Sequence, residues 1–171
     1  SKGDHVREGL ADEPRKEAAN AVRANCERIY NRVFRGCNDS EFIAIVEDDI
    51  RPRPDVFLRS TRFFDANTAS VAVPYKSRFH KGYVAWIYQD GRPQILVERG
   101  EGIIPVGGNG FGCTLLRRSV ACQHIPVGDD KLPDFDQAFY YRIQSEGWES
   151  LVDWSQEADH VQCVDGAEKA V

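Results

Sequence analysis

The stretch FIAIVEDDIRPRPDVF, residues 42 to 57, decides the predicted fold of this chain. Its first five residues are an unbroken apolar run, which is typical of a strand buried on both faces of a parallel sheet. The run ends abruptly in three adjacent carboxylates, Glu47, Asp48 and Asp49. Pro54 follows where a helix would begin, and Asp55 suits the first turn of that helix. The segment therefore predicts a strand, an acidic turn and a helix in succession.

The acidic turn has two interpretations. A run of like charges usually marks a solvated turn, but solvated turns do not usually follow a buried strand. In α/β proteins, ligands bind beyond the carboxyl ends of the strands. Carboxylate oxygens suit a hard divalent cation such as Mg²⁺ or Mn²⁺, which is often shared with substrate phosphates. This second interpretation predicts a nucleotide or a nucleotide-sugar as the ligand.

Composition limits the class of protein. A chain of 171 residues is sized for one domain, and we assign residues 1–171 to a single domain with a loop at 1–16. Hydrophobic residues make up 42% and charged residues 29%, as in soluble globular proteins. The net charge of −5 argues against nucleic acid as a partner.

The cysteines and the apolar runs indicate where the protein works. Its five cysteines never occur as C-x-x-C, which argues against a disulfide framework or zinc ribbon and favours a reducing, cytoplasmic setting. No apolar run approaches the roughly 20 residues of a transmembrane helix, so we expect no transmembrane segment. The chain contains no methionine, and we expect residues to precede Ser1.

The remaining patterns predict a mixed α/β order with an antiparallel insertion. A helix with a three-to-four apolar period runs from about Glu17 and ends at Gly36. The other expected elements are a strand at 71–73, a β-hairpin at 82–98 on an Asp-Gly turn, a strand at 113–116 after a glycine-rich turn, a helix at 134–146 and a strand at 148–154.

Four segments together resemble glycosyltransferases with the GT-A fold, over roughly residues 18 to 162. FIAIVEDDIRPRPDVF resembles their strand, acidic motif (the DxD motif) and helix, closest to family-2-like enzymes and to N-acetylglucosaminyltransferases, whose motif is also EDD. GNGFGCTLLRRSV resembles the turn and strand beside the donor sugar, and PDFDQAFYYRIQSEGW the acidic motif and helix that follow. VDWSQEADHV resembles the closing strand with its metal-binding histidine.

The resemblance implies a fold and a cofactor. It implies a mainly parallel mixed sheet flanked by helices, with Mn²⁺ or Mg²⁺ held by Asp49 and His160. A lone histidine is more often structural, and Asp153 or Asp159 could replace it as ligand or support it. Such a fold has base-binding strands well before the acidic motif, and the residues before Glu47 predict none.

The resemblance also implies substrate contacts. Glu47 would bind a donor-sugar hydroxyl, and Asp48 the ribose or the metal. The other expected donor contacts are Trp86, Asn109, Gly110 and Gly112. Trp86 could instead pack on the sheet, and a glycine run by itself could be only a turn. Arg117 and Arg118 are interpreted as structural or surface residues.

The catalytic base implied by the resemblance is Asp136. Without the other motifs, Asp136 would be interpreted as an acidic residue that stabilises the N-terminus of its helix. Asp134 remains an alternative base, because Phe135 stands where the family often has Glu. The expected function is metal-dependent transfer of a hexose or N-acetylhexosamine from a nucleotide-sugar donor to a carbohydrate or other hydroxyl acceptor, with inversion. Two alternatives stay open: an inactive sugar- or nucleotide-binding module, and a metal-dependent phosphohydrolase.

Overall fold

A five-stranded sheet forms the centre of the computed structural model, which describes residues 5–36, 39–78, 80–124, 126–128, 132, 134–164 and 167–170. Its strand order is β1 (Phe42–Val46), β8 (Cys113–Arg117), β3 (Thr68–Ala72), β9 (Glu149–Asp153) and β6 (Ile103–Val106). The β3–β9 pairing is parallel, whereas β1–β8, β3–β8 and β6–β9 are antiparallel. The chain is therefore mixed α/β as expected, but the prediction of a mainly parallel sheet is wrong.

Strands β1, β3 and β9 nevertheless run in the same direction. Strand β8 is antiparallel to both β1 and β3, and β9 is parallel to β3. Strands that run the same way end at the same edge of the sheet. The segments that follow these three strands therefore meet at one edge, which is where the acidic turn lies.

Strand β1 lies at one end of the described sheet and is not buried on both faces. Ile43 and Ile45 are buried, whereas Ala44 and Val46 are exposed. The expectation of a fully buried strand is therefore wrong. The sequence run misleads because Ala and Val are tolerated on either face, and an apolar run cannot distinguish an edge strand from a central one.

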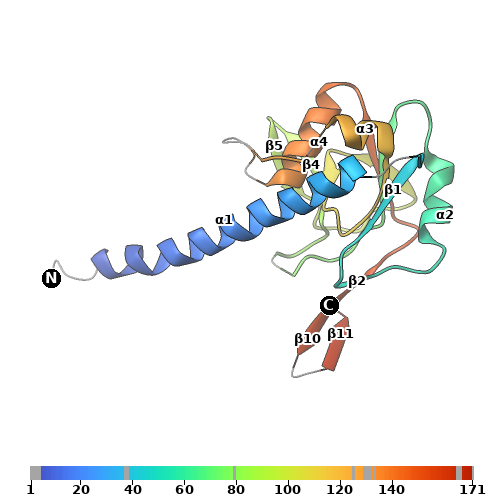
Figure 1. The fold of residues 1–171 in the computed structure, drawn as a ribbon. Coiled ribbons are helices and arrows are strands. Elements are labelled where there is room, and N and C mark those ends of the chain that lie inside the picture. Colours follow the sequence, from blue (N-terminus) through green and yellow to red (C-terminus); the bar gives the residue numbers. More distant parts are fainter. Residues whose placement is uncertain are drawn as a thin grey trace.

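Three helices cover one face of this sheet, as Figure 1 shows: α1 (His5–Gly36), α3 (Arg118–Gln123) and α4 (Phe135–Ser145). Phe34 near the end of α1 is fully buried, with ring centroids 5.9 Å from Phe111 and 6.0 Å from Phe139. These aromatic contacts fix the C-terminal half of α1 against the body of the molecule.

Helix α1 is longer than predicted. Residues 5–16 are helical rather than loop, and Figure 1 shows this end of α1 extending away from the sheet. The segment lacks an apolar period. Glu, Arg and Lys, which favour helix, make up five of its twelve residues, whereas Gly9 and Pro14 disfavour helix. The predicted loop at residues 1–4 lies outside the described residues. No described helix is both long and apolar enough to cross a membrane.

A β-hairpin and a short third strand form a second sheet. Strand β4 (Ala85–Gln89) pairs with β5 (Arg92–Ile95) and with β7 (Gly108–Asn109), in antiparallel fashion. Asp90 and Gly91 between β4 and β5 have φ angles of 52° and 71°. Two consecutive positive φ values are the requirement of a type I′ turn, so the predicted hairpin on an Asp-Gly turn is confirmed.

A third sheet joins the end of the chain to the acidic turn. It consists of β2 (Ile50–Arg51), β10 (Asp159–Val164) and β11 (Ala167–Ala170), in the order β11-β10-β2. In the antiparallel β2–β10 pairing, His160 lies opposite Ile50. The backbone N–H of Val161 also donates to the Asp49 carbonyl at 2.8 Å. This pairing places His160 directly beside the acidic turn.

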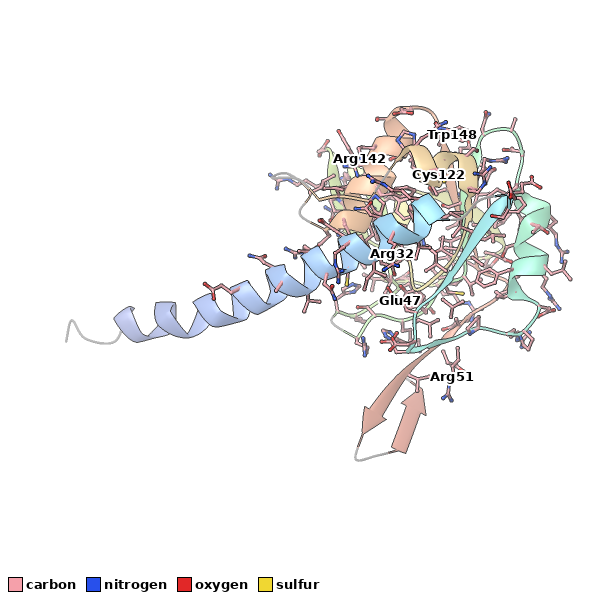
Figure 2. The ribbon with its side chains drawn as sticks, in the orientation of Figure 1. Arg32, Glu47, Arg51, Cys122, Arg142 and Trp148 are labelled. Atoms are coloured by element: carbon pink, nitrogen blue, oxygen red, sulfur yellow. The ribbon has the colours of Figure 1, made fainter. Side chains whose placement is uncertain are left out.

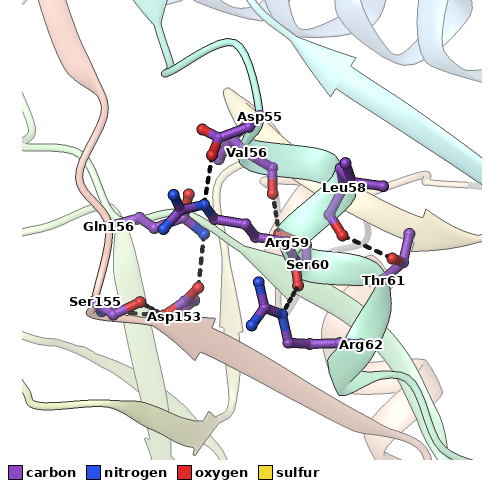
Figure 3. A network of polar contacts seen from close by, with 10 residues as sticks. All are labelled: Asp55, Val56, Leu58, Arg59, Ser60, Thr61, Arg62, Asp153, Ser155 and Gln156. Atoms are coloured by element: carbon purple, nitrogen blue, oxygen red, sulfur yellow. Dashed lines mark hydrogen bonds and ion pairs between the residues drawn. The ribbon is translucent and has the colours of Figure 1, made fainter.

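Helix α2 (Val56–Ser60) and the short 3₁₀ helix η1 (Thr61–Phe63) follow the prolines, close to the predicted position. Figure 3 shows α2 near the turn that follows β9. At the start of α2, the Arg59 guanidinium pairs with the Asp55 carboxylate at 2.5 Å, and both side chains are exposed. The Arg59–Asp55 ion pair therefore lies on the surface.

Replacing Phe34 with alanine should lower the free energy of unfolding by about 3–5 kcal/mol, because it leaves a cavity between α1 and the aromatic core. Chemical denaturation monitored by circular dichroism measures this loss. The matched control is Val22→Ala on the same helix, where the side chain is 64% exposed and the expected change is under about 0.5 kcal/mol. Equal stability losses for the two variants would contradict the docking of α1 through Phe34.

Candidate active site

The three carboxylates of the acidic turn are directed to three different surroundings. The Tyr30 hydroxyl on α1 donates to Glu47 Oε1 at 2.8 Å. Asp49 Oδ2 pairs with Arg78 Nη2 at 2.6 Å, and Asp48 is exposed. Figure 2 shows Glu47 in the region between α1 and the end of β1. The like charges are thus separated, because each carboxylate faces a different partner or solvent.

One cavity of about 640 Å³ brings together most of the predicted site residues. Glu47 at the end of β1, Asp136 in the first turn of α4 and His160 on β10 all line it. Trp86 and Gly110 also contribute to its wall. The cavity lies between the C-terminal half of α1, the start of α4 and the β4–β5 hairpin, so residues far apart in the sequence share one concave surface.

Asp49 does not line this cavity, but its carboxylate lies beside His160, which does. The distance from Asp49 Oδ2 to His160 Nε2 is 3.4 Å. His160 is buried, and its ring meets the edge of Tyr75 with centroids 5.5 Å apart. Tyr75 is itself fixed, because its hydroxyl accepts the backbone N–H of Gly112 at 3.1 Å. The imidazole is therefore held rigidly next to the carboxylate.

The hydrogen bond on the other side of the ring determines which nitrogen faces Asp49. His160 Nδ1 lies 2.7 Å from the Lys76 carbonyl oxygen. A carbonyl only accepts, so Nδ1 must carry a proton, and in the neutral ring Nε2 presents its lone pair to Asp49. A lone pair opposite a carboxylate is unfavourable unless a proton or a metal cation lies between them.

These two side chains fit the predicted cation. Neighbouring ligands of an octahedral Mg²⁺ or Mn²⁺ lie about 3 Å apart, close to the observed 3.4 Å. A histidine ligand usually donates its other ring N–H to a carbonyl or carboxylate, as His160 does here. Within the described residues there is no group of three or more His, Cys, Asp or Glu able to hold a metal. A cation held by Asp49 and His160 would take its remaining ligands from substrate phosphate and water.

The environment of Asp136 suits a proton acceptor. Burial raises the pKa of its carboxyl to about 7, and the nearby charges of Asp134 and Glu47 act in the same direction. The Gln137 backbone N–H donates to Asp136 Oδ1 at 2.7 Å and fixes the carboxylate at the helix start. A general base works best when its pKa lies near the working pH.

The alternative base, Asp134, is already engaged. Its Oδ1 pairs with Arg23 Nη2 on α1 at 2.9 Å, and both side chains are about two-fifths exposed. The Arg23 guanidinium therefore occupies one of the two oxygens with which Asp134 could accept a proton. The geometry therefore favours Asp136 over Asp134, although both line the same cavity.

Three of the predicted donor contacts do not line this cavity. Asp48 faces a second cavity of about 490 Å³ between α1 and β1. Asn109 is buried, and its amide Nδ2 donates to the Gly110 carbonyl at 2.7 Å and to Thr114 Oγ1 at 2.6 Å. Gly112 packs against the Tyr75 hydroxyl. The contacts of Asn109 and Gly112 are thus contacts within the fold.

Three further side chains make the contacts expected of structural residues. Trp86 lines the cavity but is only 2% exposed, and its ring meets Tyr140 edge-on at 5.9 Å. Arg117 Nε donates to the Thr68 carbonyl at 2.9 Å, and Arg118 Nε donates to the Ser40 carbonyl. Arg117 thus links β8 to β3, and Arg118 links α3 to the segment before β1, in agreement with the structural role expected from the sequence.

The two acids before His160 that were considered as ligands do not join it. Asp153 is buried and accepts from Ser155 Oγ at 2.6 Å and from Gln156 Nε2 at 2.7 Å, as Figure 3 shows. Asp159 is exposed and lies opposite Arg51 in the β2–β10 pairing. Successive residues of a strand face opposite sides, so Asp159 is directed away from the side occupied by His160.

Sequence reasoning missed three residues that shape the site. Tyr30 and Tyr75 fix Glu47 and His160, and Arg78 neutralises Asp49. A signal for Arg78 was present in the sequence, because KSRFHKG, residues 76–82, is a dense basic run directly after a strand. The two tyrosines carry no local pattern that marks them as site residues.

Comparisons with known proteins show a shared fold. No family model matches the chain, and no curated protein matches it. The structure is similar to the crystal structure of A197 from STIV, with a TM-score of 0.62 and 18% sequence identity, over 87% of this chain and 75% of that chain. At this identity the likeness is one of fold alone.

Replacing Gly112 with alanine should destabilise the fold by about 1–3 kcal/mol, because the added Cβ would lie 2.5 Å from the Tyr75 hydroxyl oxygen. Thermal unfolding measures the loss. Gly36→Ala is the matched control, since a Cβ there meets nothing within 4 Å. A Gly112→Ala protein as stable as this control would show that the turn does not depend on close contact with Tyr75.

Proposed function

We propose that the chain is a metal-dependent glycosyltransferase that moves a hexose or N-acetylhexosamine from a nucleotide-sugar to an acceptor hydroxyl, with inversion. One observation carries the proposal: Glu47, Asp136 and His160 line one cavity of about 640 Å³, with Asp49 against His160. The cavity is large enough for a sugar with a phosphate group. A raised carboxyl pKa and a carboxylate–histidine pair within one cleft are features of functional sites.

Asp49 and His160 would hold Mg²⁺ or Mn²⁺ through Oδ2 and Nε2. When bound, such a cation supplies electrophilic stabilisation of the negative charge that develops on a leaving diphosphate. The Lys76 carbonyl keeps His160 Nδ1 protonated, so Nε2 stays available as a ligand. Glu47, held by Tyr30, would direct its free carboxylate oxygen to a donor hydroxyl.

Asp136 would act as the base. The acceptor oxygen forms a bond to the anomeric carbon while its proton passes to the Asp136 carboxylate. The bond from that carbon to the phosphate oxygen breaks, and its electron pair leaves with the nucleoside diphosphate. The partly buried site excludes bulk water from the carboxylate, which is the same burial that raises its pKa to about 7.

The Asp136→Asn variant should lose about a hundredfold or more in turnover while it still binds donor, because the amide cannot accept the acceptor proton. In the wild type, kcat/KM should rise with pH through about 7 and then level off, since the base must be ionised. Steady-state rates from pH 5 to 9, together with donor binding by calorimetry, measure both effects.

Asp134→Asn is the matched control, because it alters a carboxylate of the same cavity that is paired with Arg23. This control should keep turnover within about tenfold and retain the rise near pH 7. If Asp134→Asn abolished turnover while Asp136→Asn kept it, the base would be Asp134. Loss of donor binding in Asp136→Asn would instead indicate a structural role.

The Asp49→Ala variant should bind Mn²⁺ at least about 10- to 100-fold more weakly than the wild type. Removal of an outer-sphere partner already costs that much affinity, and Asp49 would be a direct ligand. Its transferase activity should fall in parallel, because the carboxylate supplies one of two protein ligands. Mn²⁺ titration by electron paramagnetic resonance measures the affinity directly. Unchanged activity with unchanged Mn²⁺ dependence in Asp49→Ala would remove this residue from the metal site.

A screen of nucleotide-sugars with Mn²⁺, read as released nucleotide, tests the reaction class itself. Release of nucleotide that depends on the acceptor supports transfer. Hydrolysis of simple phosphate esters instead would support a phosphohydrolase, and binding of nucleotide-sugar without turnover would support a binding module. The same screen identifies the donor sugar and base.

A further inference from the structure

We propose that Arg78 is a diphosphate-binding residue that leaves Asp49 for the diphosphate when a cation–diphosphate complex enters the cavity. The inference rests on the proposed function and adds a residue to the site. Arg78 is identified by its position rather than by any of the motifs, and it lines the same cavity as Glu47, Asp136 and His160.

The first argument is competition for one oxygen. Arg78 Nη2 lies 2.6 Å from Asp49 Oδ2, and the same oxygen lies 3.4 Å from His160 Nε2. A cation bound between Asp49 and His160 would therefore approach the guanidinium closely. Two positive charges at that distance repel each other. A cation that arrives alone must displace Arg78 from its carboxylate.

The second argument is that a diphosphate removes this conflict. Its oxygens carry negative charge that can be shared between the cation and the guanidinium. The planar guanidinium presents paired N–H donors that match phosphate oxygens, and such bidentate contacts are strong. The Arg78 side chain is about one-third exposed and lines the cavity in addition to contacting Asp49.

The third argument is the pairing of the described residues that precede Arg78 with residues 82 and 83. Lys76 forms a bridge with Tyr83, and the Ser77 N–H donates to the Gly82 carbonyl at 3.0 Å. These contacts close the loop on both sides of Arg78. The exchange therefore needs a change of side-chain rotamer and no opening of the loop.

If Arg78 moves from Asp49 to a bound diphosphate, one substitution should have opposite effects on the affinity for Mn²⁺ alone and on the affinity for Mn²⁺ with pyrophosphate. Arg78→Gln should bind Mn²⁺ alone about three- to tenfold more tightly than the wild type, because Asp49 is freed from its competitor. The same variant should bind Mn²⁺ with inorganic pyrophosphate about tenfold more weakly, because the guanidinium contact is lost. Arg78→Lys should recover part of the pyrophosphate affinity, since it keeps the charge without the planar fork.

The experiment is a titration of the full chain with Mn²⁺, followed by electron paramagnetic resonance, with and without inorganic pyrophosphate. Pyrophosphate is the probe because it carries the diphosphate group without requiring knowledge of the base. Arg59→Gln is the matched control: Arg59 also pairs with an aspartate, Asp55, but on α2 and outside the cavity lining (Figure 3). Both affinities of this control should match the wild type.

The outcomes separate this inference from the proposed function. Tighter Mn²⁺ binding with weaker pyrophosphate binding in Arg78→Gln supports the exchange. Mn²⁺-dependent pyrophosphate binding that is unchanged in Arg78→Gln, or Mn²⁺ binding weakened in that variant, overturns the inference and leaves the proposed function standing. Failure of Mn²⁺ to bind the wild type and Arg78→Gln, with or without pyrophosphate, overturns both.

Discussion

The contact of Asp49 with Arg78 and His160 connects three segments that are far apart in the chain. Asp49 follows β1, Arg78 follows β3, and His160 lies on β10, just after β9. They meet because β1, β3 and β9 run in one direction and end at one edge of the sheet. The antiparallel β8 lies between β1 and β3 and gives them a common direction, and β9 pairs with β3 in parallel.

The backbone, rather than side-chain attraction, sets the position of His160. The β2–β10 register pairs His160 with Ile50, and the Val161 N–H donates to the Asp49 carbonyl at 2.8 Å. A shift of one residue would present the neighbouring side chain and turn the imidazole to the opposite face. The pairing of two short strands therefore decides whether a carboxylate–histidine pair exists at all.

Local features of the fold were predictable from the sequence, and long-range pairings were not. The Asp-Gly turn between β4 and β5 requires positive φ at adjacent residues, which identifies its hairpin without tertiary information. The apolar run of β1 identifies a strand, but its position in the sheet and the direction of its neighbour depend on β8. The helix at 5–16 was missed because helix propensity, with no apolar period, was its only signal.

In the candidate site, too, the sequence motifs were predictive and the contacts between distant segments were not. The motifs predicted that Glu47, Asp136 and His160 would belong together, and all three line one cavity. The choice between Asp136 and Asp134 needed the structure, because it depends on burial of one carboxyl and on Arg23, which comes from α1. Asp48 and Asn109 share the predicted motifs, yet Asp48 lies in the turn after β1 and lines the second cavity, and Asn109 is buried with its amide bonded to Thr114.

Three adjacent carboxylates at a strand end repel one another, and the structure resolves this by giving each a different environment. Glu47 accepts from Tyr30 on α1, Asp49 pairs with Arg78, and Asp48 faces solvent. Burial still raises the pKa of Glu47, with the hydroxyl of Tyr30 acting against that rise. These partners come from α1 and from the segment after β3, so the positions of α1 and of that segment determine the surroundings of Glu47 and Asp49. The contacts that hold the fold together at this edge are thus the ones that position Glu47 and Asp49.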